Sequence, residues 1–419
     1  MTKRHVVTFV LWGVVAFTSN AIAQSGSVGA PATILVDDDK VQCPDAAYST
    51  IQGAVNAARP GERIRVCAGT YPEQVAIDKS IVLKADDGVF VKPVGVSPNA
   101  AGLIQGDPLA AVFLVTNAAS VEISGFSMDG SANGFIDCGP RLIGILFQNS
   151  SGLIEGNVIR HFHLSPALPG CQSGNGIEIE TTPGNTSNVA INNNSVDDYQ
   201  KNGITANELG TIATIDRNVV TGSGPTTGTA QNGIQLGFGA SGTITNNTVI
   251  NNVWSPCIVI TECIFNATGI LVYESNDVHI GKNALGTNQV GVYASGKHAL
   301  IDFNLIFDSL EGIAVVGNGS SIQLNKIAQS ESAAVFVQGD GNHIASNEIL
   351  GAPIGISEVA GSGQNAHFEN RFLATVTRLS SAGTPATDPD NASDGVVPSN
   401  SETAGDATRA TRHRVLPSR

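Results

Sequence analysis

Most of the chain consists of short apolar runs that are broken at regular intervals by asparagine or glycine. The clearest runs are IDFNLI, IQLNKI and IASNEI, centred on Asn304, Asn325 and Asn347, which stand 21 and 22 residues apart. A second phrase follows each run, with a small residue before an apolar one, as in residues 312–315 (GIAV) and 334–337 (AVFV). Two strand-length segments in a repeat of about 22 residues are typical of one coil of a solenoid.

The asparagine position can be followed through nine successive coils. In eight of them isoleucine stands three residues before the asparagine, and His367 takes that place in the last coil. When parallel coils stack about 4.8 Å apart, such columns place aliphatic side chains inside and amides in a hydrogen-bonded ladder. A helical solenoid is disfavoured because a helix interior tolerates neither Gly nor Asn well, and the leucine pattern of leucine-rich repeats is missing. The sequence therefore predicts an all-β fold, a single parallel β-helix, with a ladder at Asn157, Asn194, Asn218, Asn247, Asn283, Asn304, Asn325, Asn347 and Asn370.

One amphipathic helix is predicted near the start, at residues 51–58, with its apolar residues on one face. Ser49 or Thr50 is a suitable N-cap, and Pro60-Gly61 ends the helix. Because a solenoid exposes the edges of its terminal coil, we expect this helix to cover the first coil. Strands are expected at residues 63–66, 75–85 and 372–379, with a turn over 67–73.

The segment VDDDKVQCPDAAYSTIQGAVNAARPGERIRVCAGTYPEQVAI resembles the opening of secreted right-handed parallel β-helix proteins of the pectate-lyase-like superfamily. The likeness is carried by Tyr48-x-Thr50-Ile51-Gln52, by Pro60-Gly61 and by Gly69-Thr70-Tyr71. With the repeats behind it, the resemblance covers residues 32 to 375 and implies a right-handed coil. That superfamily contains lyases, hydrolases, esterases, epimerases and non-catalytic surface proteins, so it implies a fold and no single function. No active-site motif of pectate lyase, polygalacturonase, pectin methylesterase or mannuronate epimerase is present.

The first 23 residues have the form of a signal peptide, with Lys3 and Arg4 before an apolar run and Ala21-Ile22-Ala23 before the expected cut. The apolar run of about 12 residues is too short for a membrane span, which needs roughly 20. We therefore expect export to the periplasm or the outside medium, with no membrane span in the mature chain. The β-helix domain is expected at 24–379, with its cap at about 32–70. Residues 380–419 are predicted to be a disordered tail; its basic end, ATRATRHRVLPSR, is expected to be solvated, with docking as the alternative.

Six cysteines and a strongly acidic balance narrow the classes of partner. An even number of cysteines in an exported chain predicts disulfides, although 15 connectivities are possible. Pairing in sequence order is favoured: Cys43–Cys67 around the helix, Cys138–Cys171 between neighbouring loops and Cys257–Cys263 within one loop.

The formal net charge of −14 argues against nucleic acid as a partner, and no basic amphipathic stretch suits anionic lipid. We expect a monomer.

Four insertions enlarge the early coils, at residues 129–143, 160–175, 221–232 and 250–268. All leave the repeat at the same point, so we expect them to form a wall along one flank, and such insertions usually mark the binding face of a solenoid. Alignment places Asp129, Arg160 and Asp197 at one corner, followed by His161 and Asp198 and then by Phe162 and Tyr199. Outward positions of the facing strands are Gln148, Glu178, Glu180, Thr205, Asn207, Gln235 and Tyr273.

The leading hypothesis is an exported protein that binds an acidic polysaccharide in this groove, with cleavage by β-elimination left open. In polyuronate lyases of this fold, carboxylates hold calcium and a Lys or Arg abstracts a proton. Under this hypothesis the aligned residues take the corresponding roles, because the resemblance itself transfers no site residue. The catalytic candidates are Lys201, Arg160 and His161, with Lys201 or Arg160 as the base. The candidate Ca²⁺ ligands are Glu178, Glu180, Asp197 and Asp198, and the candidate sugar contacts are Tyr199, Gln148, Asn207, Trp254 and Tyr273.

Each of these residues also has an ordinary structural interpretation. Arg160 between two aspartates forms a charge ladder, His161 and His163 can pack within a loop, and Glu178 and Glu180 can be solvated surface carboxylates. The alternative function is therefore a non-enzymatic module for adhesion or scaffolding in the cell envelope or outside the cell. A periplasmic metal-handling accessory is a third option, but no Met- or His-rich tract supports it.

Overall fold

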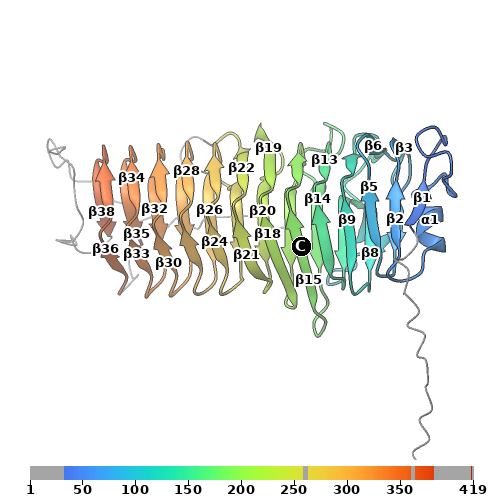
Figure 1. Cartoon of the computed structure of the whole chain (residues 1–419). Coiled ribbons are helices and arrows are strands. Elements are labelled where there is room, and N and C mark those ends of the chain that lie inside the picture. Colours follow the sequence, from blue (N-terminus) through green and yellow to red (C-terminus); the bar gives the residue numbers. More distant parts are fainter. Residues whose placement is uncertain (1–32, 258–262, 360–363, 382–416, 418–419) are drawn as a thin grey trace, which may run out of the picture.

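A computed structural model describes residues 33–257, 263–359 and 364–381 together with Pro417. The chain forms one right-handed parallel β-helix whose coils stack from β1 at one end to β38 at the other (Figure 1). Within the described residues, three parallel sheets, here called A, B and C, contain 13, 12 and 13 strands. The segment predicted to be a signal peptide, residues 1–23, and most of the predicted tail lie outside the described residues.

Sheet A runs the length of the molecule, and a ladder asparagine follows each of its last nine strands. Its strands are β1 (Thr33–Val36), β2 (Arg63–Val66), β5 (Val82–Ala85), β9 (Val121–Ser124), β12 (Gly152–Glu155), β15 (Ser187–Asn192), β18 (Thr211–Asp216), β21 (Ser241–Thr245), β24 (His279–Gly281), β27 (Leu300–Asp302), β30 (Ser321–Gln323), β33 (His343–Ala345) and β36 (Ala366–Phe368).

Sheet B follows sheet A after a single bend in each coil. Its strands are β3 (Gly69–Tyr71), β6 (Val89–Val91), β10 (Ser127–Asp129), β13 (Val158–Arg160), β16 (Ser195–Asp197), β19 (Val219–Thr226), β22 (Thr248–Trp254), β25 (Ala284–Gly286), β28 (Leu305–Phe307), β31 (Lys326–Ala328), β34 (Glu348–Leu350) and β37 (Arg371–Leu373).

Sheet C closes each coil and carries the longest connections on its incoming side. Its strands are β4 (Val75–Ile77), β8 (Pro108–Thr116), β11 (Arg141–Gln148), β14 (Asn175–Glu180), β17 (Asn202–Asn207), β20 (Asn232–Gly237), β23 (Thr268–Tyr273), β26 (Val290–Ser295), β29 (Glu311–Val315), β32 (Ala333–Val337), β35 (Ile354–Glu358) and β38 (Thr377–Ser381), and β7 (Ala100–Ala101) pairs antiparallel with β8.

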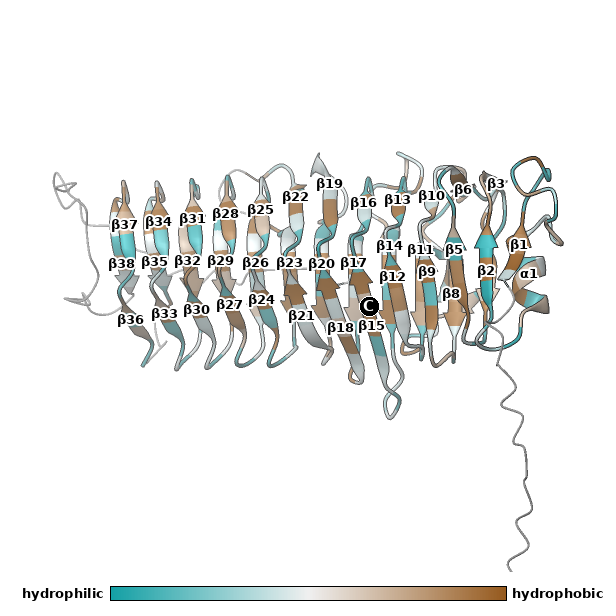
Figure 2. Ribbon diagram, viewed as in Figure 1, coloured by the Kyte–Doolittle hydropathy of each residue, from teal (hydrophilic) through white to brown (hydrophobic). Residues whose placement is uncertain are grey.

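The predicted asparagine ladder is confirmed at the bend between sheets A and B. Asn157 Nδ2 donates to Asn194 Oδ1 at 3.0 Å, and the same bond recurs between each successive pair as far as Asn347 and Asn370, at 2.9 Å. The isoleucines three residues before these asparagines are fully buried in one continuous core. At the exceptional position His367, the Nε2 atom lies 2.9 Å from Glu358 Oε1. The alternation of apolar and polar residues along the strands is visible in Figure 2.

The Gly-Ile phrase has a steric cause at the start of the sheet C strands. A Cβ atom added to Gly203 would lie 2.6 Å from the carbonyl oxygen of Gly233 in the next coil. Any side chain at this inward position therefore collides with the neighbouring backbone, because protein interiors leave no spare volume for it. The following isoleucines, Ile204 and Ile234, fill the interior instead.

The capping helix is confirmed as α1 (Ile51–Ala57), which lies over the first coil in Figure 1. Thr50 is its N-cap and accepts from Gly53 N at 3.2 Å. The side chain of Gln52 donates to Ala76 O and accepts from Ala76 N, so it occupies the edge of β4 that would otherwise be unpaired. This arrangement closes the end of the solenoid as the sequence predicts.

Three strand predictions are wrong in detail. Residues 75–85 bend at residues 78–81 and form β4 and β5, because each side of a coil here is only three or four residues long. The expected turn at 67–73 contains β3, and residues 372–379 contribute to both β37 and β38. The three disulfides connect the cysteines in sequence order, as predicted. Within the described ranges, no helix is both long and apolar enough to cross a membrane.

Candidate functional site

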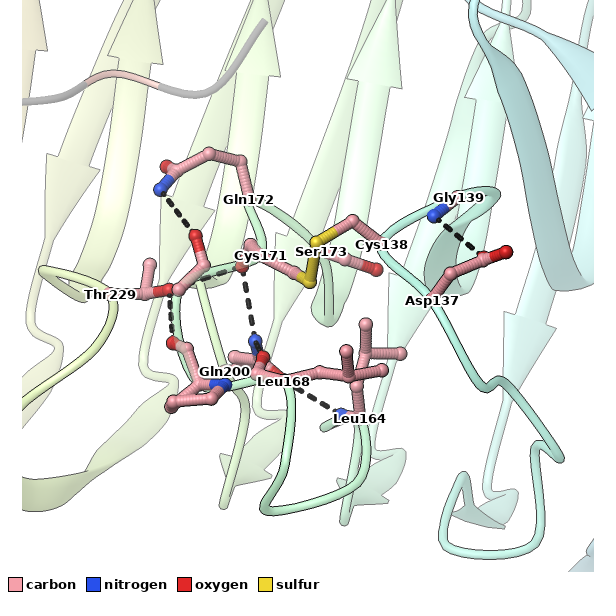
Figure 3. Close-up of a disulfide and its surroundings, with 12 residues drawn as sticks. Asp137, Cys138, Gly139, Leu164, Leu168, Cys171, Gln172, Ser173, Gln200 and Thr229 are labelled. Carbon is pink, nitrogen blue, oxygen red and sulfur yellow. Dashed lines mark hydrogen bonds between the residues drawn. A yellow bond between two sulfur atoms is a disulfide. The ribbon is translucent and has the colours of Figure 1, made fainter.

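The enlarged connections form a wall where sheet B turns into sheet C, as the sequence predicts. They join β10 to β11, β13 to β14, β19 to β20 and β22 to β23. The Cys138–Cys171 disulfide ties the first connection to the second (Figure 3). These loops therefore stand beside the outer face of sheet C.

Hydrogen bonds extend the same wall across the next two coils. Gln200 Nε2 donates to Leu168 O at 2.8 Å and to Cys171 O at 3.1 Å. Thr229 Oγ1 donates to Pro169 O at 2.8 Å and to Cys171 O at 3.1 Å. Figure 3 shows Gln200 and Thr229 directed at the loop that carries Cys171. Loops from four successive coils are thus held in one shape.

The outer face of sheet C beside this wall carries a row of amides and hydroxyls. Backbone register aligns them in columns from β14 to β23, and the alternating inward residues belong to the core. We call this set the amide row: Asn202, Thr205, Asn207, Asn232, Gln235 and Thr268. The row continues towards aromatic rings, because Tyr273 and Tyr293 occupy outward positions on β23 and β26.

Side-chain hydrogen bonds link the amide row between strands. Asn202 Nδ2 donates to Thr205 Oγ1 at 2.8 Å and to Gln235 Oε1 at 3.1 Å. Gln235 Nε2 donates to Asn207 Oδ1 at 2.9 Å, and Asn232 Nδ2 donates to Asn202 Oδ1 at 3.2 Å. Such a network fixes the amide orientations and presents both donors and acceptors in one plane.

A buried cluster of one arginine and three carboxylates ends the amide row. Arg141 Nε lies 2.7 Å from Asp107 Oδ2, its Nη1 lies 2.9 Å from Glu178 Oε1, and its Nη2 lies 3.2 Å from Glu180 Oε1. Gln148 Nε2 also donates to Glu180 Oε2 at 3.1 Å. Arg141 and Asp107 were not expected at a site. The sequence signal that could have indicated Arg141 is its position, as a charged residue, at the start of the apolar run RLIGILF.

The electrostatics of this cluster follow from burial and charge. Burial acts to lower the pKa of Arg141, but the charges of Glu178, Asp107 and Glu180 outweigh it and raise that pKa above its usual value. Burial, and then the neighbouring charge of Glu178, raise the pKa of Glu180 to about 7, against the opposing effect of Arg141. One cation thus neutralises two almost fully buried carboxylates and a third at the rim.

The corner residues lie where the sequence alignment places them. Asp129, Arg160 and Asp197 are neighbours in register on sheet B. Arg160 Nη2 lies 3.5 Å from Asp197 Oδ2, whereas Asp129 pairs with Lys92 at 2.9 Å. Burial acts to raise the pKa of Asp129, but hydrogen bonds from Ser131 and the charge of Lys92 lower it to about 2. At this corner Arg160 therefore pairs with one of the two aspartates of the expected charge ladder, and Lys92 pairs with the other.

The histidines lie directly beside that corner, where His161 follows Arg160 in the chain. His163 Nε2 lies 3.3 Å from Asp198 Oδ2, and the ring centroids of His161 and His163 are 6.4 Å apart. Both aspartate–cation pairs and this histidine pair are partly exposed. They form a set separate from the amide row, because they stand on sheet B and its following loops.

Two residues assigned to the groove surface are in the interior, which corrects the predicted groove. Lys201 is fully buried, with Nζ donating to Ala230 O at 2.9 Å, and burial lowers its pKa to about 7. Tyr199 is fully buried and donates from its hydroxyl to Asn252 Oδ1 at 2.5 Å, so it offers no platform to a sugar. Sequence spacing places both residues near the corner but does not specify whether they point inward or outward.

The remaining predicted sugar contacts are also covered, and Tyr273 is the most accessible of them. Trp254 packs edge-on against Phe265 with ring centroids 5.6 Å apart and is 8% exposed. Tyr273 is half-buried beside Phe238. Gln148 and Asn207 are buried, at 6% and 1% exposure. A ligand on this face would meet the tyrosine ring first.

The four predicted calcium ligands do not form one site. Glu178 and Glu180 face outward on sheet C and bind Arg141, whereas Asp197 and Asp198 stand at the end of a sheet B strand. Among the described residues, groups of three potential ligands occur elsewhere, at Asp37–Asp39 and at Asp86 beside the Cys43–Cys67 disulfide. The set expected to hold Ca²⁺ is therefore dispersed.

Comparisons with known proteins agree on the fold and differ in function. A family model described as "NosD: Periplasmic copper-binding protein (NosD)" matches residues 255–391, less than half of the chain. A structure of PfbA, a surface adhesin of Streptococcus pneumoniae, is 16% identical with a TM-score of 0.59 and covers 85% of this chain and 96% of that chain. A second PfbA structure is 15% identical with a TM-score of 0.55, covering 79% and 94%. No curated protein is significantly similar in sequence.

A catalytic structure is among the similar ones. The GH136 lacto-N-biosidase from Eubacterium ramulus is 10% identical with a TM-score of 0.50 and covers 80% of this chain and 67% of that chain. At these identities the likenesses establish the fold alone. The right-handed parallel β-helix fold, expected for residues 32–375, is confirmed.

Copper binding, named by the matching family model, is not supported by the residues of that segment. Copper sites gather Cys, Met or His donors. The described histidines of the segment lie on separate coils, and three of them face carboxylates: His279 with Asp302, His298 with Asp277, and His367 with Glu358. Cys257 and Cys263 are joined in a disulfide. No cluster of three donors forms within the described part of 255–391.

Proposed function

We propose that this chain is an exported, non-catalytic β-helix that binds an uncharged oligo- or polysaccharide on the outer face of sheet C. The amide row carries the proposal. The amides and hydroxyls of the row are buried and bond one another, so a ligand would exchange these bonds for bonds to its own hydroxyls, starting at the half-buried ring of Tyr273. The disulfide-tied wall keeps this surface in one shape, which limits the entropy lost on binding.

The charges of this face favour a neutral ligand over the acidic polymer expected from the sequence. Among the described outward positions of β14 to β29, the charged side chains are the carboxylates Glu178, Glu180 and Glu311. Arg141 is already bound to three carboxylates, and Lys201 is buried under the wall. A polyanion would therefore find no exposed cation at these described positions, so its charges would lose hydration without compensation.

Binding without cleavage is supported by the state of the ionisable groups. A glycosidase needs two carboxyl groups that reach the scissile bond, and one of them must exchange a proton. Glu180 has a raised pKa that suits an acid, but Arg141 holds both Glu178 and Glu180, and their exposures are 0% and 5%. An eliminating enzyme would need a base at the surface, where Lys201 does not lie.

Export and a surface role draw support from the comparisons. The matching family is described as periplasmic, and the PfbA structures belong to a surface adhesin. If no glycan binds, adhesion to another macromolecule becomes the favoured function, because the likeness to PfbA extends over 96% of that chain. The fold alone does not decide between these two roles.

Gel-mobility retardation on neutral and acidic polysaccharides tests the proposal, with product assays for reducing ends and for unsaturated uronate. We expect retardation by a neutral polymer, no product, and no effect of chelator. Gln235→Ala should abolish retardation, whereas the matched change Thr214→Ala on the exposed face of sheet A should not. Retardation by acidic polymers alone, or product formation, would overturn the proposal.

A further inference from the structure

An open hollow of about 570 Å³ lies on the outer face of sheet A, towards the capped end of the solenoid. It crosses the first residues of β5, β9 and β12, which are neighbouring strands from successive coils. Its volume is within the roughly 300–1,000 Å³ of small-molecule pockets. The amide row stands on sheet C, so the hollow is a separate part of the surface.

Connections of unequal length from sheet C to sheet A shape the hollow. Its floor includes residues of the short connections 78–81, 117–120 and 149–151. The connection of the next coil, 181–186, is longer and extends beyond its neighbours below β15 in Figure 1. On the other side the chain turns at residues 58–62, between α1 and β2. The hollow is therefore bounded at both ends along the solenoid.

A row of serine hydroxyl groups runs along the hollow, one from each coil. Strand register aligns Ser80, Ser120 and Ser151 with one another. Ser80 Oγ accepts from Ser120 N at 3.1 Å, and Ser151 Oγ accepts from Asn188 N at 2.9 Å. The next coil thus fixes the position of each of these two oxygens. Because a hydroxyl also carries a hydrogen, both groups remain able to donate to a ligand.

One carboxylate and two apolar side chains complete the lining. Glu122 lies between Val82 and Leu153 in the register of sheet A, and all three side chains are partly exposed. Glu122 Oε1 accepts from Ser124 Oγ at 3.1 Å, which helps to orient the carboxylate. A carboxylate has lone pairs for several donors, so Glu122 can accept further hydrogen bonds from a ligand.

The chemistry of this lining disfavours most classes of ligand. Calcium and magnesium ions favour several carboxylates, and the described lining contains a single one. An anion would meet Glu122 without a cation, because the same lining contains no Lys or Arg. A peptide cannot join sheet A as an added strand, because β5, β9 and β12 are each paired on both sides. A neutral molecule with many hydroxyl groups fits best.

We propose that the hollow binds a neutral mono- or disaccharide, with Glu122 accepting from adjacent sugar hydroxyls and the serines donating to others. The C–H groups of the sugar would cover Val82 and Leu153. Charge-assisted hydrogen bonds are roughly twice as strong as neutral ones, so Glu122 is the main anchor. This site uses no residue of the amide row and does not depend on the proposed function. With both sites occupied, one molecule joins two saccharides on different faces of the solenoid.

Saturation-transfer difference NMR on the full chain tests the site, with maltose, cellobiose, xylobiose and mannobiose as probes. At least one disaccharide should bind, and Glu122→Gln should weaken that binding about tenfold or more, because the charged acceptor is lost. The matched control is Glu155→Gln, which changes a partly exposed carboxylate of the same sheet outside the hollow and should bind like the parent. No binding by any probe, or equal binding by Glu122→Gln and the parent, would overturn the inference.

A second variant separates this site from the amide row. Gln235→Ala should leave disaccharide binding unchanged, although it should abolish the retardation by a neutral polymer. Disaccharide binding that is lost in Gln235→Ala but retained in Glu122→Gln would overturn the inference and place the ligand on sheet C. Disaccharide binding that depends on Glu122, without retardation of the parent by any polymer, would refute the proposed function alone.

Discussion

Replacement of Arg141 by methionine should destabilise the protein strongly at pH 7 and weakly at pH 5. The change removes the cation that binds Asp107, Glu178 and Glu180, whose side chains are 30%, 0% and 7% exposed. Leaving buried charges without their partner costs about 3–5 kcal/mol. A carboxylate escapes this penalty by taking up a proton, which costs about 1.4 kcal/mol for each pH unit above its ordinary pKa.

That relation sets the pH dependence. For a group with an ordinary pKa near 4.3, protonation costs about 4 kcal/mol at pH 7 but only about 1 kcal/mol at pH 5. Between these values the folded variant binds more protons than the unfolded chain, so its stability falls as pH rises. Urea denaturation followed by circular dichroism at both pH values measures the difference.

Arg160→Met is the matched control for this experiment, because Arg160 also pairs with an aspartate but is 48% exposed. Exposed pairs contribute roughly 0–1 kcal/mol, so the control should lose little stability at either pH. A triple variant that combines Arg141→Met with Glu178→Gln and Glu180→Gln should recover part of the stability that Arg141→Met loses. If Arg141→Met were as stable as the parent at pH 7, or lost the same stability at pH 5, the account of the cluster would be refuted.

Three further changes probe other parts of the fold. Burial raises the pKa of Glu311 to about 8, so the protein loses stability as the pH rises from the ordinary pKa of a glutamate towards 8. Glu311→Gln should remove that loss, which is on the order of 4 kcal/mol. Thermal melting temperatures of the variant that follow those of the parent from pH 5 to pH 9 would contradict this. Asn218→Ala breaks the ladder and leaves buried backbone amide and carbonyl groups unpaired. The free energy of unfolding, measured with denaturant, should therefore fall by about 2–4 kcal/mol. The control Asn188→Ala, at an exposed position, should lower it by less than about 1 kcal/mol. Replacing Cys138 and Cys171 together by serine opens a 33-residue separation and should cost roughly 3–4 kcal/mol in the same assay, and an unchanged midpoint would show that the wall is held by its hydrogen bonds alone.

The coil architecture could be predicted because it depends on columns that repeat along the sequence. An asparagine at a fixed bend, an isoleucine three residues earlier and a glycine at the start of sheet C each meet their equivalents in the next coil. A residue that recurs in the sequence pattern therefore also identifies its partner in the neighbouring coil. Where the repeat weakens, as in residues 75–85 near the cap, the bend was missed and one strand was predicted in place of two.

The candidate site was less predictable because its residues lie outside the repeating columns. Lys201 and Tyr199 belong to connections, where sequence spacing gives the coil but not the direction of the side chain. The outward residues of sheet C were placed correctly, yet their burial depends on segments far away in the sequence, such as residues 100–107 above Glu180. The pairing of Arg141 with Glu178 spans 37 residues and has no local signature.

Arg141 links the stability of the site to the kind of function it can support. Burial beneath residues 100–107 raises the pKa of Glu180 to about 7, and without the opposing charge of Arg141 that pKa would rise further. The same contacts of Arg141 prevent these carboxylates from approaching a scissile bond. Conversion of this surface to a hydrolytic site would need displacement of Arg141 and therefore exposure of the cluster. The interaction that stabilises the end of the amide row is thus the physical reason to expect binding, and not cleavage, along the rest of it.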